Sequence, residues 1–273
     1  MADIKAADVM KLRKATGAGM MDCKKALQEA EGDFEKAVDE IRKKGKAIAD
    51  KRADREASEG SVQAKVEGGF GAIISLNCET DFVAKNEDFV KFAGSILDLA
   101  IAEKPADLEA LMALSLEGKV LSELIIERSG MIGEKLELAY YGPIEAEFIQ
   151  PYNHPGNNLA TIVGFSKADV AEQVAKDVAM QIAAMAPVAV DESGVSAEII
   201  AHEKEIGRAK AIEEGKPENI VDRIAEGMVK KFLKDNTLLN QEFTKDNKKT
   251  VAQYISEADK DLKVTGFKRF SVK

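Results

Sequence analysis

Hydrophobic positions in the first part of the chain recur three and four residues apart, which predicts helices. Three short helices are expected over residues 6–44, with breaks at Gly17 and Gly32 and an Asp33 cap on the third. Their inward positions are Val9, Leu12, Cys23, Ala26, Leu27, Ala30, Phe34, Ala37, Val38 and Ile41. Residues 1–55 are therefore predicted to form a small helical bundle, with a solvated helical linker over residues 45–58.

The period then changes to two, which predicts strands. Alternating positions from Val62 and from Ala72 flank a turn at Gly68-Gly69, and a long helix is expected from about Asn86. Shorter helices near residues 107–113 and 118–129 precede a strand at Leu136 and Leu138. These elements define a predicted core subdomain over residues 56–141.

The second half, residues 142–273, repeats this order of elements. Strands are expected near 144–149 and 159–165, a helix over about 168–185, and a closing strand near 263–272. The chain is therefore predicted to be an α+β protein whose core is a duplication of small antiparallel sheets packed with helices.

An insertion at residues 195–233 predicts an antiparallel helical hairpin of the coiled-coil type. A helix begins at Ser196, residues 215–217 (Gly-Lys-Pro) break it after Glu214, and a second helix runs to about Leu233. The two arms are expected to face each other through Ile199, Ile206, Ala209, Ile220, Ile224 and Met228. Such a hairpin is either a structural spur or a contact for a partner or a second copy.

Composition narrows the classes of ligand. The net charge of −9 argues against nucleic acid as the main ligand, because phosphate binding needs clustered Lys and Arg. No run approaches 18 apolar residues, and residues 1–5 do not open a signal peptide, so no membrane association and a cytoplasmic location are expected. Cys23 and Cys78 stand outside any metal or redox spacing and are predicted to be buried, reduced thiols.

No catalytic set is recognisable, and we expect neither enzyme activity, a cofactor nor a metal site. The only histidines are His154, in a tight turn, and His202, among charged hairpin residues. Residues 16–19, Thr-Gly-Ala-Gly, lack the Gly-Lys of a phosphate loop and join two helices rather than following a strand. Nucleotide binding by this chain itself is not expected.

Two longer motifs are specific. Residues 16–27 read TGAGMMDCKKAL, and residues 77–85 read NCETDFVAK. With them the chain resembles bacterial elongation factor Ts over nearly all 273 residues, and the first 55 resemble a ubiquitin-associated domain. The resemblance implies a guanine nucleotide exchange factor that binds elongation factor Tu, both GDP-bound and nucleotide-free, and promotes GDP release. The alternative is a binding scaffold that does not exchange nucleotide.

The resemblance also implies contact residues. Thr80, Asp81, Phe82 and Val83 correspond to the family segment that displaces magnesium from the GTPase. The other implied contacts are Met20 and Met21, the segment Ile132-Gly133-Glu134, and His154. Some family members continue past the last strand with a further contact helix, which this chain is expected to lack.

For two of these assignments, the alternative is that the side chain is buried in the protein's own core instead of contacting a partner. The residues alone allow two orientations of Phe82. A short turn capped by Thr80 would face the ring outward, but burial beneath the following helix with Phe89 and Phe92 is the favoured expectation. The resemblance reverses this preference and favours the outward-facing ring. Similarly, Met20 and Met21 suit an adaptable apolar contact. We nevertheless expect at least one of the two methionines to fill the bundle core.

Overall fold

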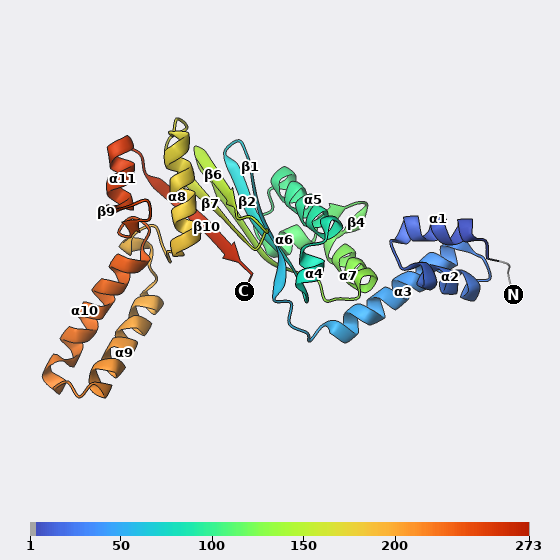
Figure 1. The fold of residues 1–273 in the computed structure, drawn as a ribbon, viewed down its shortest axis with the longest axis horizontal. Coiled ribbons are helices and arrows are strands. Elements are labelled where there is room, and N and C mark those ends of the chain that lie inside the picture. Colours follow the sequence, from blue (N-terminus) through green and yellow to red (C-terminus); the bar gives the residue numbers. More distant parts are fainter. Residues whose placement is uncertain (1–3, 273) are drawn as a thin grey trace.

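The computed structural model describes residues 4–272, and Figure 1 shows an elongated molecule with three parts. A helical bundle lies at one end, two sheets with their helices form the centre, and a helical hairpin projects at the other end. Residues 1–3 of the predicted bundle and residue 273 of the predicted second subdomain lie outside the described residues. The predicted α+β class is confirmed.

The bundle consists of α1 (Ala6–Thr16), α2 (Met20–Glu29) and the first half of α3 (Phe34–Arg52). Gly17 ends α1 in the left-handed conformation, with φ of 71°, and the Asp33 side chain accepts a hydrogen bond from the Lys36 amide at the start of α3. Its buried core is Val9, Leu12, Ala18, Cys23, Ala26, Leu27, Ala30, Ala37 and Ile41.

The predicted solvated helical linker over residues 45–58 is helical as far as Arg52, and Gly45 is the one residue of this stretch that is buried. Helix α3 continues without interruption to Arg52, and Gly45 is buried where α3 crosses α7 (Leu121–Ile132). The two helices approach so closely that a Cβ on Gly130 would lie 2.2 Å from the Gly45 Cα. Two facing glycines permit this approach, and the sequence period of α3 does not reveal it.

The first half of the core is one antiparallel sheet in the order β1-β2-β5, formed by Glu59–Glu67, Phe70–Cys78 and Glu137–Glu145. The β1–β2 turn is at Gly68-Gly69, as expected. Helix α5 (Glu87–Glu103) covers this sheet together with α7, and their shared core includes Ile74, Leu76, Phe89, Phe92 and Ile96. The smaller elements here are α4 (Asp81–Ala84), α6 (Leu108–Met112), β3 (Ser115–Leu116) and β4 (Lys119–Val120).

The second half repeats the topology in the order β6-β7-β10, so the expected duplication is confirmed. Its strands are Phe148–Asn153, Leu159–Phe165 and Val264–Ser271. In each half, the closing strand pairs antiparallel with the second strand of the hairpin. The other elements are α8 (Glu172–Met185), η1 (Glu192–Gly194), β8 (Glu242–Phe243), β9 (Asp246–Thr250) and α11 (Val251–Ala258).

The two sheets share a core of their own. Apolar residues of β1 and β2 meet those of β6 and β7 in one cluster of Val62, Ala64, Ile73, Ile149, Ala160 and Ile162. Strand β2 is therefore buried on both faces, one against this cluster and one against α5. The strand expected near 144–149 is wrong, because β5 ends at Glu145 and a new strand, β6, begins at Phe148.

The hairpin consists of α9 (Ala197–Glu213) and α10 (Glu218–Asn236), which project from the sheets in Figure 1. Of the predicted contacts between its arms, Met228 does face α9, with its Sδ 3.4 Å from the position of a Cβ on Gly207, but Ile199, Ile206 and Ala209 are exposed and the prediction is wrong for them. The buried residues are Gly207 and Ala211 on α9, with Val221, Ala225 and Val229 on α10. A Cβ on Gly207 would lie 3.0 Å from the Ala225 Cα, so small residues bring the arms together and leave Ile199 and Ile206 exposed. No helix within residues 4–272 is both long and apolar enough to cross a membrane.

Candidate functional site

The most exposed large aromatic side chain sits on a short turn between β2 and α5. Thr80 caps α4, its hydroxyl accepting a hydrogen bond from the Val83 amide at 3.4 Å. Asn86 then caps α5 by accepting from the Asp88 amide at 2.9 Å. Two caps six residues apart fix the path of the chain through this turn, because each satisfies amides that would otherwise lack a partner.

Within this turn, Phe82 is 84% exposed, whereas Val83 and Ala84 pack against the first core. The outward orientation that the resemblance implied is confirmed, and burial of Phe82 with Phe89 and Phe92 is wrong. The helical turn explains the result, since its inward positions are already occupied by the two aliphatic residues. Asp81 is partly exposed and forms an ion pair with Lys85 at 2.7 Å, which lowers the pKa of the Asp81 carboxyl.

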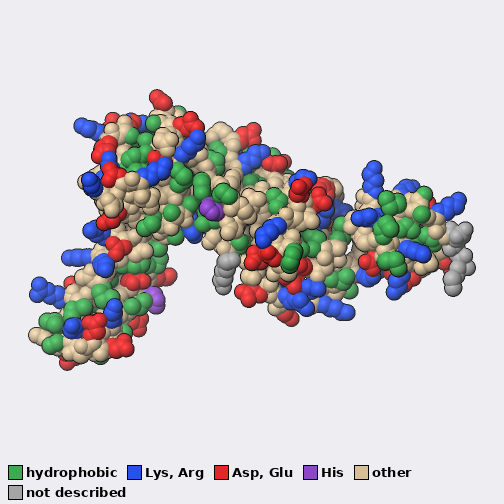
Figure 2. All heavy atoms as spheres, viewed as in Figure 1, with side chains coloured by type: hydrophobic (Ala, Val, Ile, Leu, Met, Phe, Trp, Pro, Cys, Tyr) green, Lys and Arg blue, Asp and Glu red, His purple; other side chains and the backbone are tan. Residues whose placement is uncertain are grey.

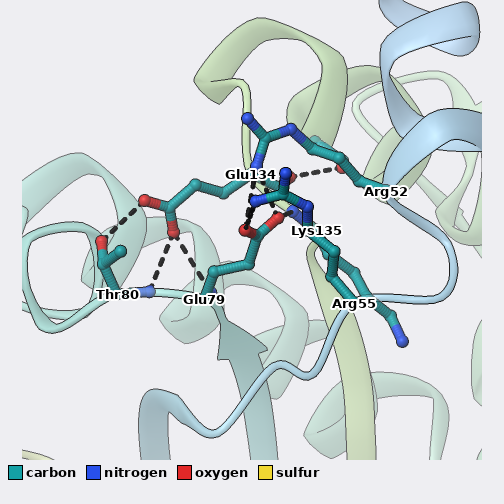
Figure 3. Close-up of polar contacts among 7 residues, drawn as sticks. Arg52, Arg55, Glu79, Thr80, Glu134 and Lys135 are labelled. Carbon is teal, nitrogen blue, oxygen red and sulfur yellow. Dashed lines mark hydrogen bonds and ion pairs between the residues drawn. The ribbon is translucent and has the colours of Figure 1, made fainter.

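The carboxylates of Glu79 and Glu134 form hydrogen bonds that hold this turn on its inner side (Figure 3). Glu134 Oε2 accepts hydrogen bonds from the Glu79 amide at 3.1 Å and the Thr80 amide at 3.0 Å, and Glu134 Oε1 accepts from the Thr80 hydroxyl at 2.6 Å. In the opposite direction, Glu79 Oε1 accepts from the Lys135 amide at 2.6 Å. We call Glu79 and Glu134 together the carboxylate brace.

The brace also reaches the bundle. Arg52, the last residue of α3, places its Nη1 2.8 and 2.9 Å from the two carboxylate oxygens of Glu79. Arg55 Nη1 lies 3.1 Å from Glu79 Oε2. The Glu79 side chain is only 11% exposed. Burial alone would raise the pKa of Glu79, but the hydrogen bonds from the Lys135 amide and the two arginines outweigh it and lower that pKa.

Ile132 and Gly133 lie beside the same turn. Ile132 is 40% exposed and, together with Phe82 and Val83, lines a surface groove that extends to Gly17 of the bundle. Gly133 ends α7 with φ of 82°, a conformation that glycine adopts without strain. It redirects the chain so that the side chain of the next residue, Glu134, points back to Thr80 (Figure 3).

Met20 and Met21 begin α2 and are 52% and 78% exposed. The expectation that at least one of them fills the bundle core is wrong. Ala18, in the preceding loop, is buried in that core, and Cys23 follows one turn later. The first turn of α2 therefore stays at the surface.

His154 is separate from the Phe82 groove. It lies in the turn between β6 and β7, where its ring Nδ1 is 2.9 Å from the Tyr152 hydroxyl and its side chain is exposed. The structure thus groups Phe82, Val83 and Ile132 on one groove but places His154 on another element.

The other residue types that could bind a metal or react do not form a second site within residues 4–272. Among residues 4–272, no cluster of His, Cys, Asp or Glu has the composition to hold a metal ion. Cys23 and Cys78 are buried and free, as expected, and burial raises the pKa of the Cys78 thiol to about 12. On the face drawn in Figure 2, apolar side chains are in view on both the bundle and the hairpin, with charges of both signs between them.

The resemblance placed Glu134 in a contact segment, but sequence reasoning missed its hydrogen bonds to Glu79 and Thr80 and therefore missed the brace. Glu79 and Glu134 are 55 residues apart and stand in no catalytic or metal spacing. The one available signal was position, since Glu79 directly precedes the Thr80 cap. A surface carboxylate at such a position is common, so the sequence did not distinguish it from a solvated one.

An exposed aromatic on a doubly capped turn, beside a groove lined by apolar, polar and charged residues, is typical of a macromolecule-binding surface rather than of a reaction centre. Comparison with known proteins identifies the class more closely. Residues 79–273 match the family model described as elongation factor TS. The chain belongs to the elongation factor Ts family, whose members are translation elongation factors.

Relatives named elongation factor Ts align over almost the whole chain. The protein from Porphyromonas gingivalis is 53% identical, and the alignment covers 97% of each chain. The protein from Azobacteroides pseudotrichonymphae is 52% identical, again over 97% of each. The protein from Christiangramia forsetii is 50% identical over 100% of both.

Proposed function

We propose that this protein binds elongation factor Tu and promotes release of GDP by displacing magnesium and disturbing the phosphate site, so that GTP can reload. The observation that carries the proposal is the exposure of Phe82 on a turn fixed by the Thr80 and Asn86 caps. Leaving so large a ring in water has no benefit for the free protein. Its placement suits insertion into an apolar slot of a partner.

The mechanism follows from what holds GDP in a GTPase. Magnesium and the phosphate-binding loop compensate the charge of the diphosphate. When Phe82 and its neighbours force apart the segments that position the metal, the phosphates lose this compensation. Thermodynamic linkage then requires that nucleotide weaken the binding of this protein as much as this protein weakens the binding of nucleotide.

Phe82 cannot supply the required energy alone. A ten-thousandfold acceleration needs about 5–6 kcal/mol of barrier lowering. Burying one phenylalanine contributes about 1.5–3 kcal/mol. Binding energy from other surfaces must therefore drive the distortion, and exposed Ile132, Met20 and Met21 are the proposed sources, with Asp81, Thr80, Val83, Gly133 and His154 as further contacts.

The test is the release of fluorescently labelled GDP from elongation factor Tu in a stopped-flow instrument. Adding the protein should accelerate release, and Phe82→Ala should slow the accelerated rate strongly while leaving much of the affinity for nucleotide-free elongation factor Tu. Ile126→Ala is a matched control, because Ile126 is also an exposed apolar residue of the core but does not line the Phe82 groove. A release rate unchanged by Phe82→Ala removes that ring from the mechanism.

A scaffold that binds without exchange is the second candidate. Both functions predict a complex, but only the complex of an exchange factor is dissociated by excess GDP. Titrating GDP into the assembled pair therefore discriminates between them. A complex indifferent to GDP favours the scaffold.

The hairpin remains a predicted second contact. Ile199 and Ile206, which are seven residues apart and share one face of α9, are 37% and 43% exposed, because the close seam at Gly207 is filled by small residues instead. We propose this face as the contact through which the complex could dimerise. The mass of the complex by light scattering, over a range of concentrations, tests it.

A further inference from the structure

We propose that Glu134 is a positioning residue for nucleotide exchange: it contributes by holding the Phe82 turn and makes no contact with the partner itself. The inference rests on the proposed function of Phe82 and adds the device that fixes its geometry. It also divides the Ile132–Gly133–Glu134 segment into an outward contact and an inward support.

The first argument is directional. All three hydrogen bonds accepted by the Glu134 carboxylate come from two consecutive residues, Glu79 and Thr80. These residues join the end of β2 to the first turn of α4, and Phe82 follows two positions later. A carboxylate that accepts two amides and a hydroxyl is a strong anchor, because charge-assisted hydrogen bonds are shorter and stronger than neutral ones.

The second argument concerns what holds Glu134 in turn. Gly133 redirects the chain at the end of α7, the Ser129 hydroxyl donates to the Glu134 carbonyl at 2.5 Å, and the Lys135 amide donates to Glu79. The segments 79–80 and 134–135 are therefore joined by side chains running in both directions (Figure 3). Neither segment can shift without breaking hydrogen bonds of the other.

The third argument links the brace to the bundle. Arg52 binds both oxygens of Glu79, so the end of α3 is attached at the residue preceding Thr80. Helix α3 is also seated on α7 through Gly45 and Gly130. The bundle, with its exposed methionines, and the Phe82 turn are thereby held in one fixed relative geometry. This arrangement allows binding energy gained at the bundle to act on the turn.

The rigidity has a functional reason. Phe82 can displace segments of a partner only if its own turn keeps its conformation during binding. A helix as short as α4 has little stability of its own, so the turn needs support from other residues. Misplacing a reacting or contacting group by about 1 Å can reduce a rate by roughly a hundredfold. Loss of Glu134 should therefore slow exchange about tenfold to a hundredfold, even though its carboxylate points into the molecule.

A double-mutant cycle on GDP release tests the proposal, with Glu134→Ala, Phe82→Ala and the double variant. If Glu134 acts through Phe82, Glu134→Ala slows exchange in the natural background but has little further effect once Phe82 is absent. A merely structural defect would slow both backgrounds equally. Glu137→Ala is the matched control, because it removes the same charge from an exposed carboxylate that forms an ion pair with the Lys135 side chain and takes no part in the hydrogen bonds of the brace.

Further variants keep the test decisive if Glu134→Ala is poorly folded. Glu134→Gln keeps an acceptor for the two amides and should restore most of the rate. Thr80→Val loses both the hydrogen bond to Glu134 and the cap on the Val83 amide, and it should slow exchange. Amide hydrogen exchange at Glu79 and Thr80 in the free protein should rise in Glu134→Ala.

The outcomes separate the two proposals. If Phe82→Ala leaves release unchanged, the proposed function of Phe82 fails and the inference fails with it. If Phe82→Ala is slow but Glu134→Ala is either as fast as the natural protein or fully additive, only the positioning role is overturned. Coupling in the cycle, with rescue by Glu134→Gln, supports it.

Discussion

Helix α3 packs against α7 through two facing glycines, Gly45 and Gly130, and replacing each by alanine should have different effects on stability. A Cβ at Gly130 would lie 2.2 Å from the Gly45 Cα and 2.4 Å from its carbonyl carbon. A Cβ at Gly45 would lie 3.6 Å from the Gly130 Cα, an ordinary contact distance. The same change, Gly to Ala, should therefore have opposite effects at the two positions.

The expected magnitudes follow from packing and helix propensity. Carbon atoms pack best about 3.5–4.0 Å apart, so Gly130→Ala must move α3 away by roughly 1.5 Å. Such overpacking costs about 1–3 kcal/mol, whereas replacing a helical glycine by alanine gains about 1 kcal/mol. Gly130→Ala should lose stability or release α3, and Gly45→Ala should be neutral or slightly more stable.

Three measurements test the effect of these two substitutions. Urea unfolding reports stability, small-angle scattering reports whether the bundle leaves the core and enlarges the molecule, and hydrogen exchange reports whether Arg52 still holds α3 at Glu79. Gly227→Ala on exposed α10 is the control, since no atom lies within 4 Å of its Cβ position. Equal effects at Gly45 and Gly130, or an unchanged Gly130→Ala protein, would refute the reasoning.

Two further predictions concern the bundle and the second core. Met21→Asp should leave the urea midpoint unchanged, because the side chain is exposed, and should weaken binding to elongation factor Tu in a titration; a loss of folding instead would show that Met21 supports the bundle. Buried Asp177 accepts hydrogen bonds from Lys245, Tyr254 and Gln173, which outweigh its burial and lower its pKa. The folded protein thus prefers the carboxylate, and this stabilisation is present above the unfolded pKa of about 3.9 and lost as pH falls through the lower folded value. Melting temperatures of Asp177→Asn should accordingly fall less steeply than those of the natural protein below about pH 4, and parallel curves would contradict this assignment.

Several features of this protein could be predicted from local sequence, because each depends on residues close together in the chain. The period of three and four specified the bundle helices, the Gly68-Gly69 turn specified the β1–β2 hairpin, and the Gly215–Pro217 break specified two arms of the insertion. The repeated order of elements indicated the duplication. In each case a local backbone preference and a one-sided apolar pattern agreed with the final fold.

Other features depended on which distant segments meet. Periodicity counts large apolar residues, so it selected isoleucines for the hairpin seam, whereas the structure uses Gly207 and Ala225 to bring the arms close. The periodicity also placed Gly45 in a solvated linker, because nothing in the sequence of α3 indicates that Gly45 faces Gly130 on α7. Close approach is a property of two surfaces, and neither sequence segment encodes it alone.

The same distinction applies to the site. The residues themselves offered both orientations of Phe82, and the resemblance of residues 77–85 favoured the exposed one. The tertiary structure decided it, because Val83 and Ala84 occupy the inward positions of the turn. The carboxylate brace required the fold entirely, since hydrogen bonds between segments 55 residues apart form only after β2 and α7 have packed into one core.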